Sequence, residues 1–201
     1  ESLALRGNKL HHFPEIFHRW TALTELVVSN NRIAELQLQF EVLSTLEVLN
    51  LEGNLLVSPP REVLQQGTPL TLEYIKRLKL ARETKILDLC SFGLRVLPVE
   101  VIKNNSRLRE LKLSNNNMKV LPGDIRMLAE MQLLMVDTNV LSELPTELSY
   151  LHIAVAAGCH HQSAPVSAVL AWQAHESDQS AARREPHPIT PARPEAPHQH
   201  H

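Results

Sequence analysis

The sequence has few aromatic residues, few cysteines and no excess of either charge. Aromatic residues make up 4% of the 201 residues, and the formal net charge at pH 7 is -2. A nearly neutral chain lacks the positive field that attracts nucleic acid or an anionic membrane, so we expect neither as a partner. The two cysteines do not form a disulfide framework like that of small secreted proteins. This favours a reducing compartment, and we predict a cytoplasmic location.

Long apolar runs and catalytic motifs are also missing. No apolar run is long enough to span a bilayer, and we expect no secretory leader. The six glycines are dispersed, and no Gly-Lys-Ser/Thr triplet marks a phosphate-binding loop. Cys90 has Asp88 two residues earlier, but no histidine is close enough in the sequence pattern to activate a thiol nucleophile. We therefore predict that the protein is not an enzyme and binds no cofactor and no metal.

Leucine, in contrast, is abundant and recurs at fixed intervals. The unit L-x-x-L-x-L-x-x-N-x-L-x-x-L-P-x-x-L-x-x-L-x-x, about 23 residues long, fits the length of a leucine-rich repeat. The L-x-L pair has period two, which predicts a short strand with both apolar side chains facing inward. The Asn can satisfy buried backbone groups at the following turn, and the Pro fixes the start of the convex side. One unit cannot bury its leucines alone, whereas stacked units can.

The repeat stops between residues 67 and 83. Thr68 is a candidate N-cap, Pro69 suits the first helical position, and Leu70, Tyr74 and Leu78 follow the four-residue spacing of an amphipathic helix. Two arrangements are open. The helix could project from the convex side of one continuous sheet, or it could end the first block and leave a joint at residues 81–84. We favour the continuous sheet.

These patterns predict an α/β fold. It is a leucine-rich repeat solenoid with a curved parallel sheet on the concave face and short helices and loops on the convex face. We expect a first repeat block at 1–66, a helical insertion that closes it at 67–83, a second block at 84–153, and a disordered Ala/Pro/His-rich tail at 154–201. The composition changes abruptly at the tail, and we hypothesise that the tail is not a native continuation of the repeats.

The segments "LSNNNMKVLPGDI" and "TNVLSELPTEL" resemble intracellular leucine-rich repeat proteins of the N-x-L-x-x-L-P type, the group that includes Ras-suppressor and the Shoc-2 scaffold. The resemblance covers roughly residues 2–151. "PPREVLQQGTPLTLEYIKRL" is similar to segments that close a repeat block in this family. Two positions depart from the pattern: Phe92 stands where Asn is expected, and Gln37 stands where Pro is expected. Glu1 falls inside a repeat, so we expect the chain to be a fragment.

The concave face is the expected binding surface, because side chains between the inward leucines form an array there. The predicted partner-binding residues are Glu25, Val27, Glu47, Asn50, Glu52, Asp88, Arg109, Lys112, Met135 and Asp137. The first rows are acidic and the last are apolar. A partner with a basic portion over rows two to four and an apolar contact near Met135 would be complementary. Alternatively, these charges only keep the sheet soluble.

We therefore predict a non-catalytic scaffold or adaptor that binds a protein partner. The family resemblance implies intracellular signalling, with a small GTPase or a phosphatase as the partner. One alternative is the recognition arm of a larger enzyme, a GTPase or a ligase, whose catalytic domain lies outside this sequence. Another is a fragment without activity, because solenoids need polar caps at both ends.

Overall fold

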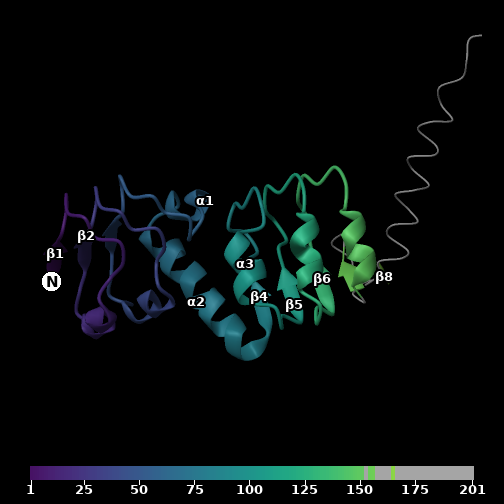
Figure 1. Cartoon of the computed structure of the whole chain (residues 1–201), viewed down its shortest axis with the longest axis horizontal. Coiled ribbons are helices and arrows are strands. Elements are labelled where there is room, and N and C mark those ends of the chain that lie inside the picture. The colour runs from purple at the N-terminus through teal and green to yellow at the C-terminus, as the bar shows by residue number, and fades with distance from the viewer. Residues whose placement is uncertain (152–153, 157–163, 166–201) are drawn as a thin grey trace, which may run out of the picture.

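The computed structural model describes residues 1–151, 154–156 and 164–165 (Figure 1). The strands are β1 (Ser2–Ala4), β2 (Glu25–Val27), β3 (Val48–Asn50), β4 (Ile86–Asp88), β5 (Glu110–Lys112), β6 (Leu133–Met135), β7 (Ala154–Ala156) and β8 (Ala164–Pro165). The helices are α1 (Arg61–Leu64), α2 (Thr68–Thr84) and α3 (Val99–Asn104), with 3₁₀ helices η1 (Glu15–Arg19), η2 (Leu38–Val42), η3 (Gly123–Met127) and η4 (Thr146–Tyr150). No helix in the described ranges has the length and apolarity needed to cross a membrane.

The strands stack in parallel with equivalent repeat positions aligned. In the first sheet Leu3 pairs with Leu26 and Leu26 with Leu49, and in the second sheet Leu87, Leu111 and Leu134 align in the same way. Leu26, Leu87, Leu111 and Leu134 are fully buried, whereas Leu3 and Leu49, at the two edges of the first sheet, are partly buried. This confirms the predicted L-x-L strands, whose inward residues form the core while the residues between them face outward.

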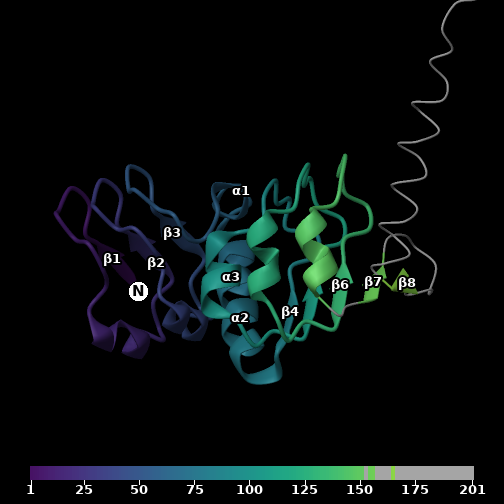
Figure 2. The same ribbon diagram turned by 45° about the vertical axis from the view of Figure 1, so that its right-hand side comes forward.

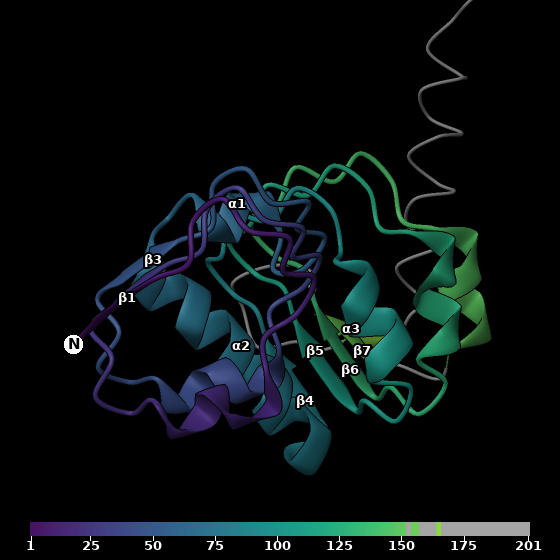
Figure 3. The ribbon, with the colours of Figure 1, turned by 60° about the vertical axis from the view of Figure 1, so that its left-hand side comes forward.

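The continuous sheet favoured from the sequence is wrong. Strands β1–β3 form one sheet and β4–β8 another, and β3 does not pair with β4. Helix α2 lies between the two sheets and crosses the space where a further strand would stand (Figures 1 and 3). The interruption therefore ends the first block, which was the second of the two arrangements considered from the sequence.

Helix α2 buries side chains against both blocks, so it separates the two sheets while contributing to both cores. Leu72 and Ile75 pack against the first core, whereas Tyr74, Leu78 and Ala81 belong to the second. The outermost leucines of the second core are thus fully buried at the break, whereas those of the first block, Leu49, Leu51 and Leu56, stay partly exposed.

Polar side chains of α2 also satisfy backbone groups at the two open sheet edges. Thr68 Oγ1 accepts a hydrogen bond from the Leu49 N–H at 2.9 Å. On the other side Arg77 Nη1 donates to the Asp88 carbonyl at 2.9 Å, and Thr84 Oγ1 donates to the Ile86 carbonyl at 3.2 Å. An adjacent strand makes these bonds in a regular repeat, and buried backbone groups need such partners. Thr68 is therefore not the predicted N-cap, and Gly67, with φ at 96°, stands at that position.

The repeated Asn residues connect each strand to the strand before it. Asn116 Nδ2 donates to the carbonyls of Leu89 and Leu113, both at 2.8 Å, and its Oδ1 accepts from the Leu94 N–H at 2.9 Å. The equivalent atoms of Asn31, Asn54 and Asn139 make the same kinds of bond. Each of these Asn residues thus bonds to backbone groups of its own turn, as the sequence predicts. It also bonds to the preceding strand, which the sequence does not predict.

Phe92 replaces Asn where no strand precedes, because α2 stands there and offers no strand carbonyl to bond. Its ring is buried and packs edge-on against Tyr74, with ring centroids 5.6 Å apart. The Arg77 guanidinium carbon lies 5.1 Å from the centroid of the Phe92 ring. Gln66 Nε2 donates to the Phe92 carbonyl at 2.7 Å, which satisfies the turn. The departure is thus a consequence of the helix.

The second departure, Gln37, keeps the backbone conformation of the proline it replaces. Its φ and ψ of -69° and 150° are close to the -64° and 148° of Pro14 in the preceding repeat. Since the substitution leaves the start of η2 unchanged, it does not disturb the stack.

The repeat register continues three residues beyond the predicted second block. Strand β7 pairs in parallel with β6, and β8 pairs with β7 in an antiparallel manner (Figure 2). The rest of the predicted tail lies outside the described residues, as do Cys159 and the tail histidines.

Candidate functional site

The exposed face of the two sheets is built from residues that alternate with the inward leucines. Two rows run across the strands. The first row is Ser2, Glu25, Val48, Ile86, Glu110 and Leu133, and the second is Ala4, Val27, Asn50, Asp88, Lys112 and Met135. A third row follows the strand ends, at Arg6, Ser29, Glu52, Cys90, Ser114 and Asp137. The break at α2 divides every row into two halves.

Most of the predicted binding residues lie in these rows, but two do not. Glu47 and Arg109 each precede a strand by one residue, and both are exposed. The positions that face outward in their place are Glu110 and Val48. Only Val48 was missed from the sequence. Counting in steps of two from Leu49 would have found Val48.

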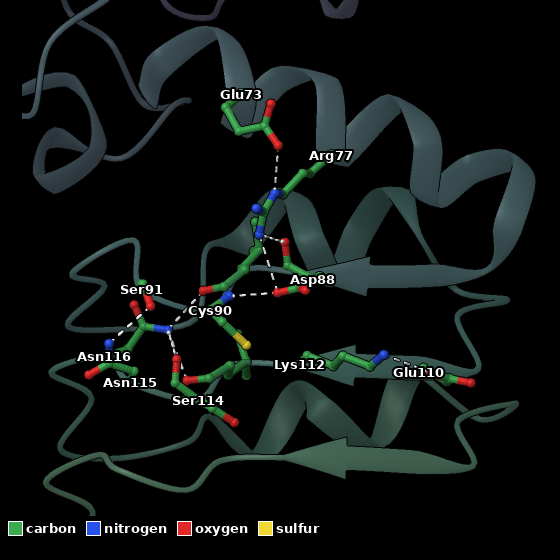
Figure 4. Close-up of polar contacts among 12 residues, drawn as sticks. Glu73, Arg77, Asp88, Cys90, Ser91, Glu110, Lys112, Ser114, Asn115 and Asn116 are labelled. Carbon is green, nitrogen blue, oxygen red and sulfur yellow. Dashed lines mark hydrogen bonds and ion pairs between the residues drawn. The ribbon is translucent and has the colours of Figure 1, made fainter. Parts of the chain in front are cut away.

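The Asp88 and Glu110 carboxylates on the second sheet form ion pairs (Figure 4). Arg77 Nη1 lies 3.2 Å from Asp88 Oδ1, and Arg77 Nε lies 2.9 Å from Glu73 Oε1. Lys112 Nζ lies 3.3 Å from Glu110 Oε2. Burial alone would raise the pKa of Asp88, but the hydrogen bond from the Cys90 N–H and the charges of Arg77 and Lys112 lower it below its usual range. Asp88 therefore stays ionised, and its carboxylate is paired with Arg77 of α2.

The free acidic charge lies on and beside the first sheet instead. Glu25 accepts a hydrogen bond from Ser2 Oγ at 2.8 Å. In the part of the chain that the structure describes, Glu25, Glu47 and Glu52 form no ion pair. The face therefore has an acidic first half and a second half whose charges are largely paired internally.

Apolar side chains gather on the second half of the face. Ile86 is 39% exposed, and Leu133 and Met135 are partly exposed. Ser114 Oγ donates a hydrogen bond to Asp137 Oδ1, as Ser2 Oγ does to Glu25 on the first sheet. A partner that contacts both halves would meet acidic groups first and an apolar surface next.

The geometry agrees with what the chain is similar to. Residues 82–141 match the family model described as "Leucine rich repeat". A relative in Oryza sativa subsp. japonica, "Plant intracellular Ras-group-related LRR protein 7", is 34% identical over 70 residues, which are 35% of this chain and 27% of the relative. The chain thus spans about a quarter of that relative's length.

Two further matches are to much longer proteins. The "Probable inactive serine/threonine-protein kinase roco10" of Dictyostelium discoideum is 38% identical over 63 residues, which are 31% of this chain and 2% of that protein. The solved structure of a leucine-rich repeat protein from Leptospira interrogans is 24% identical and covers 77% of this chain and 38% of that chain, with a TM-score of 0.36.

Cys90 lies within the third row of these leucine-rich repeats, between Asp88 and Ser114 (Figure 4). Burial, followed by the hydrogen bond and the negative charge of Asp88, raises the pKa of the Cys90 thiol. A raised pKa leaves less thiolate, the reactive form, at a given pH. Within the described residues no cluster of three or more His, Cys, Asp or Glu side chains could hold a metal ion.

We expect Cys90 to be alkylated more slowly than free cysteine at pH 8, because its thiolate fraction is smaller. The measurement is the rate of reaction with iodoacetamide from pH 7 to 10 in a Cys159→Ser background, in which Cys90 is the only thiol. The Asp88→Asn variant removes the negative charge and should shift the rate profile to lower pH. If the alkylation rate of Cys90 rises at the same pH as that of free cysteine, or at a lower pH, the burial and charge described for Cys90 are contradicted.

Proposed function

We propose that the protein is a non-catalytic scaffold or adaptor that binds a protein partner on its concave face. The observation that carries this proposal is the free acidic charge of Glu25, Glu47 and Glu52 on and beside the first sheet, together with an apolar region at Leu133 and Met135 on the second sheet. Leucine-rich repeat solenoids in general use extended concave surfaces for binding. The partner would place a basic segment over the first sheet and an apolar side chain near Met135, with charge contributing mainly to selectivity and association rate.

The class of partner is part of the proposal. The name of the rice relative contains "intracellular" and "Ras-group-related", which supports an intracellular signalling role. We propose a cytoplasmic location, with a small GTPase or a phosphatase as the bound protein. No catalytic, cofactor or metal role is proposed for any residue of the chain.

A second candidate function is recognition on behalf of a larger enzyme. The Dictyostelium relative is named as a probable inactive kinase, and the match covers 2% of it. Repeats of this kind therefore also occur as a small part of a long protein. A phosphate-binding loop in the full-length chain would favour this candidate over a free-standing adaptor.

Charge reversal tests the acidic half of the face. In the Glu25→Lys/Glu47→Lys/Glu52→Lys variant we expect at least a tenfold loss of the partners captured by the unsubstituted protein, because like charges would then oppose the basic segment. The matched control reverses three exposed glutamates outside the face, Glu35, Glu130 and Glu143. Both variants should keep the parent circular dichroism melt. Unchanged capture by the first variant, or equal loss in both, would contradict the proposed face.

A further inference from the structure

A groove of about 610 Å³ lies where the first sheet ends. Its walls come from β3, the following turn, α1 and the first turn of α2, and four of its lining residues are the partly exposed Leu49, Leu51, Leu56 and Leu64. The volume is in the range of protein pockets that hold small ligands or short segments. Inward leucines line most of the groove, and Glu52 of the third outward row lies at its margin.

One backbone group in this groove lacks the partner that its equivalents have. In the preceding repeat the Val28 N–H donates to the Asn50 carbonyl of the next strand at 2.9 Å, and in the second block the Leu113 N–H donates to the Met135 carbonyl at 2.8 Å. The equivalent group at the break is the Leu51 N–H. It meets no acceptor among the described residues, because α2 replaces the next strand.

A second N–H group lies two residues further along. The Asn30 N–H donates to the Glu52 carbonyl at 2.7 Å, as does the Asn115 N–H to the Asp137 carbonyl at 3.0 Å. The group in the same position at the break is the Gly53 N–H, and within the described ranges it too meets no acceptor. Gly53 lines the groove beside Leu51.

The break also removes a third partner, which is the Asn side-chain amide that the next repeat would supply. Asn54 Oδ1 accepts from the Ile33 N–H at 3.0 Å, and Asn54 Nδ2 donates to the Val28 carbonyl at 3.0 Å. The corresponding groups at the break are the Leu56 N–H and the Leu51 carbonyl. Phe92 occupies the Asn position of the following repeat and cannot bond to either, so the Leu56 N–H has no acceptor among the described residues.

We propose that this groove binds a short extended peptide segment of a partner protein in which an Asn follows an apolar residue by three positions. Backbone carbonyls of the segment accept from the Leu51 and Gly53 N–H groups, as in strand addition to a sheet edge. The Asn amide accepts from the Leu56 N–H and donates to the Leu51 carbonyl. The apolar side chain packs on the groove leucines.

The ends of the segment are also defined. Thr68 Oγ1 already accepts from the Leu49 N–H, so pairing can begin only at Leu51 and the segment is shorter than a full repeat. A residue just before the apolar one would point to the concave side. Glu52 lines the groove and forms no ion pair in the described part of the chain, so a lysine or arginine at that position complements its charge.

The test uses a synthetic peptide with the sequence of residues 111–117 of this chain, "LKLSNNN", which carries the required spacing at Lys112, Leu113 and Asn116. It is titrated into the ¹⁵N-labelled full chain and followed by NMR. We expect the Leu51, Gly53 and Leu56 amide protons to shift downfield together as they gain acceptors. A peptide with Asn116→Leu should bind roughly tenfold more weakly, since it loses two hydrogen bonds.

A Leu64→Lys variant of the protein should also bind the first peptide at least tenfold more weakly, whereas Glu130→Lys, far from the groove, should bind it normally. If Leu64→Lys does not fold, the difference in affinity of the unsubstituted protein for the two peptides still tests the proposal. Equal affinity for both peptides, or shifts confined to β1 or to the outward rows, would overturn the proposal. So would concentration-dependent shifts of these amides without peptide, because a second copy of the chain would then fill the groove.

Discussion

Replacing Asn116 with alanine lowers the free energy of unfolding by roughly 3–5 kcal/mol. The Leu94 N–H and the Leu89 carbonyl lose the hydrogen bonds that Asn116 makes to them, and the Leu113 carbonyl keeps only the bond from Asn139. The Asn116 side chain is 6% exposed and bonds to groups of Leu89, Leu94 and Leu113. Urea unfolding followed by circular dichroism measures the loss, and an unchanged slope of the transition would show that the unfolded state is not altered.

Asn8 is the matched control for this effect. It occupies the same repeat position, but it is exposed and its Nδ2 reaches only the carbonyls of Leu5 and Arg6 in its own turn. Asn8→Ala should therefore cost about 1 kcal/mol or less. Similar losses for Asn8→Ala and Asn116→Ala would mean that the connection between neighbouring strands adds nothing to stability.

Replacing Tyr74 with alanine should cost about 3–5 kcal/mol, because a fully buried aromatic side chain leaves a cavity at the joint. The ring packs on Phe92, and the hydroxyl donates to Glu100 Oε1 at 2.9 Å. Glu100 Oε1 also accepts from Ser58 Oγ of the first block at 2.7 Å. Burial, followed by the charge of Glu100, raises the pKa of Tyr74, so the hydroxyl remains a donor throughout the neutral range.

The Tyr74→Phe variant separates packing from hydrogen bonding. It keeps the ring against Phe92 and loses only the bond to Glu100, so we expect a loss of about 1–2 kcal/mol. In Tyr74→Ala the two blocks should also lose their coupling, and amide hydrogen exchange should show the first sheet opening before the second. Equal losses in the two variants, with uniform exchange, would mean that Tyr74 does not hold the joint.

The repeated strands could be predicted because their signal is local and redundant. Inward positions such as Leu26 and Leu111 recur with period two inside a longer repeat, so stacking is the arrangement that buries them all. Helix α2 was also predictable, since Pro69 and the spacing of Leu70, Tyr74 and Leu78 carry a helical pattern. These features depend on residues close together in the chain.

The break in the sheet could not be predicted, because it depends on long-range side-chain bonds. Thr68 and Arg77 replace strand partners through contacts with Leu49 and Asp88, and nothing in their local sequence distinguishes these roles from a helix cap and a solvated cation. Phe92 was the available signal. Because the repeat Asn bonds to a carbonyl of the preceding strand, a repeat without this Asn indicates that no strand precedes it.

The candidate site was predicted in part for the same reason. Glu25, Val27 and Asn50 lie where the period of two places them. Asp88 lies there too, but its pairing with Arg77 depends on the helix, and this removes it from the free acidic set.

The most direct test of the whole account is a nuclear Overhauser measurement across the break between β3 and β4. If α2 replaces a strand, contacts will connect the Thr68 side chain to the Leu49 amide and Arg77 to Asp88, and no backbone contact will connect β3 with β4. Cross-strand contacts between the amide and α protons of Leu49 and Leu87 would instead show one continuous sheet. They would contradict both the joint and the groove beside it.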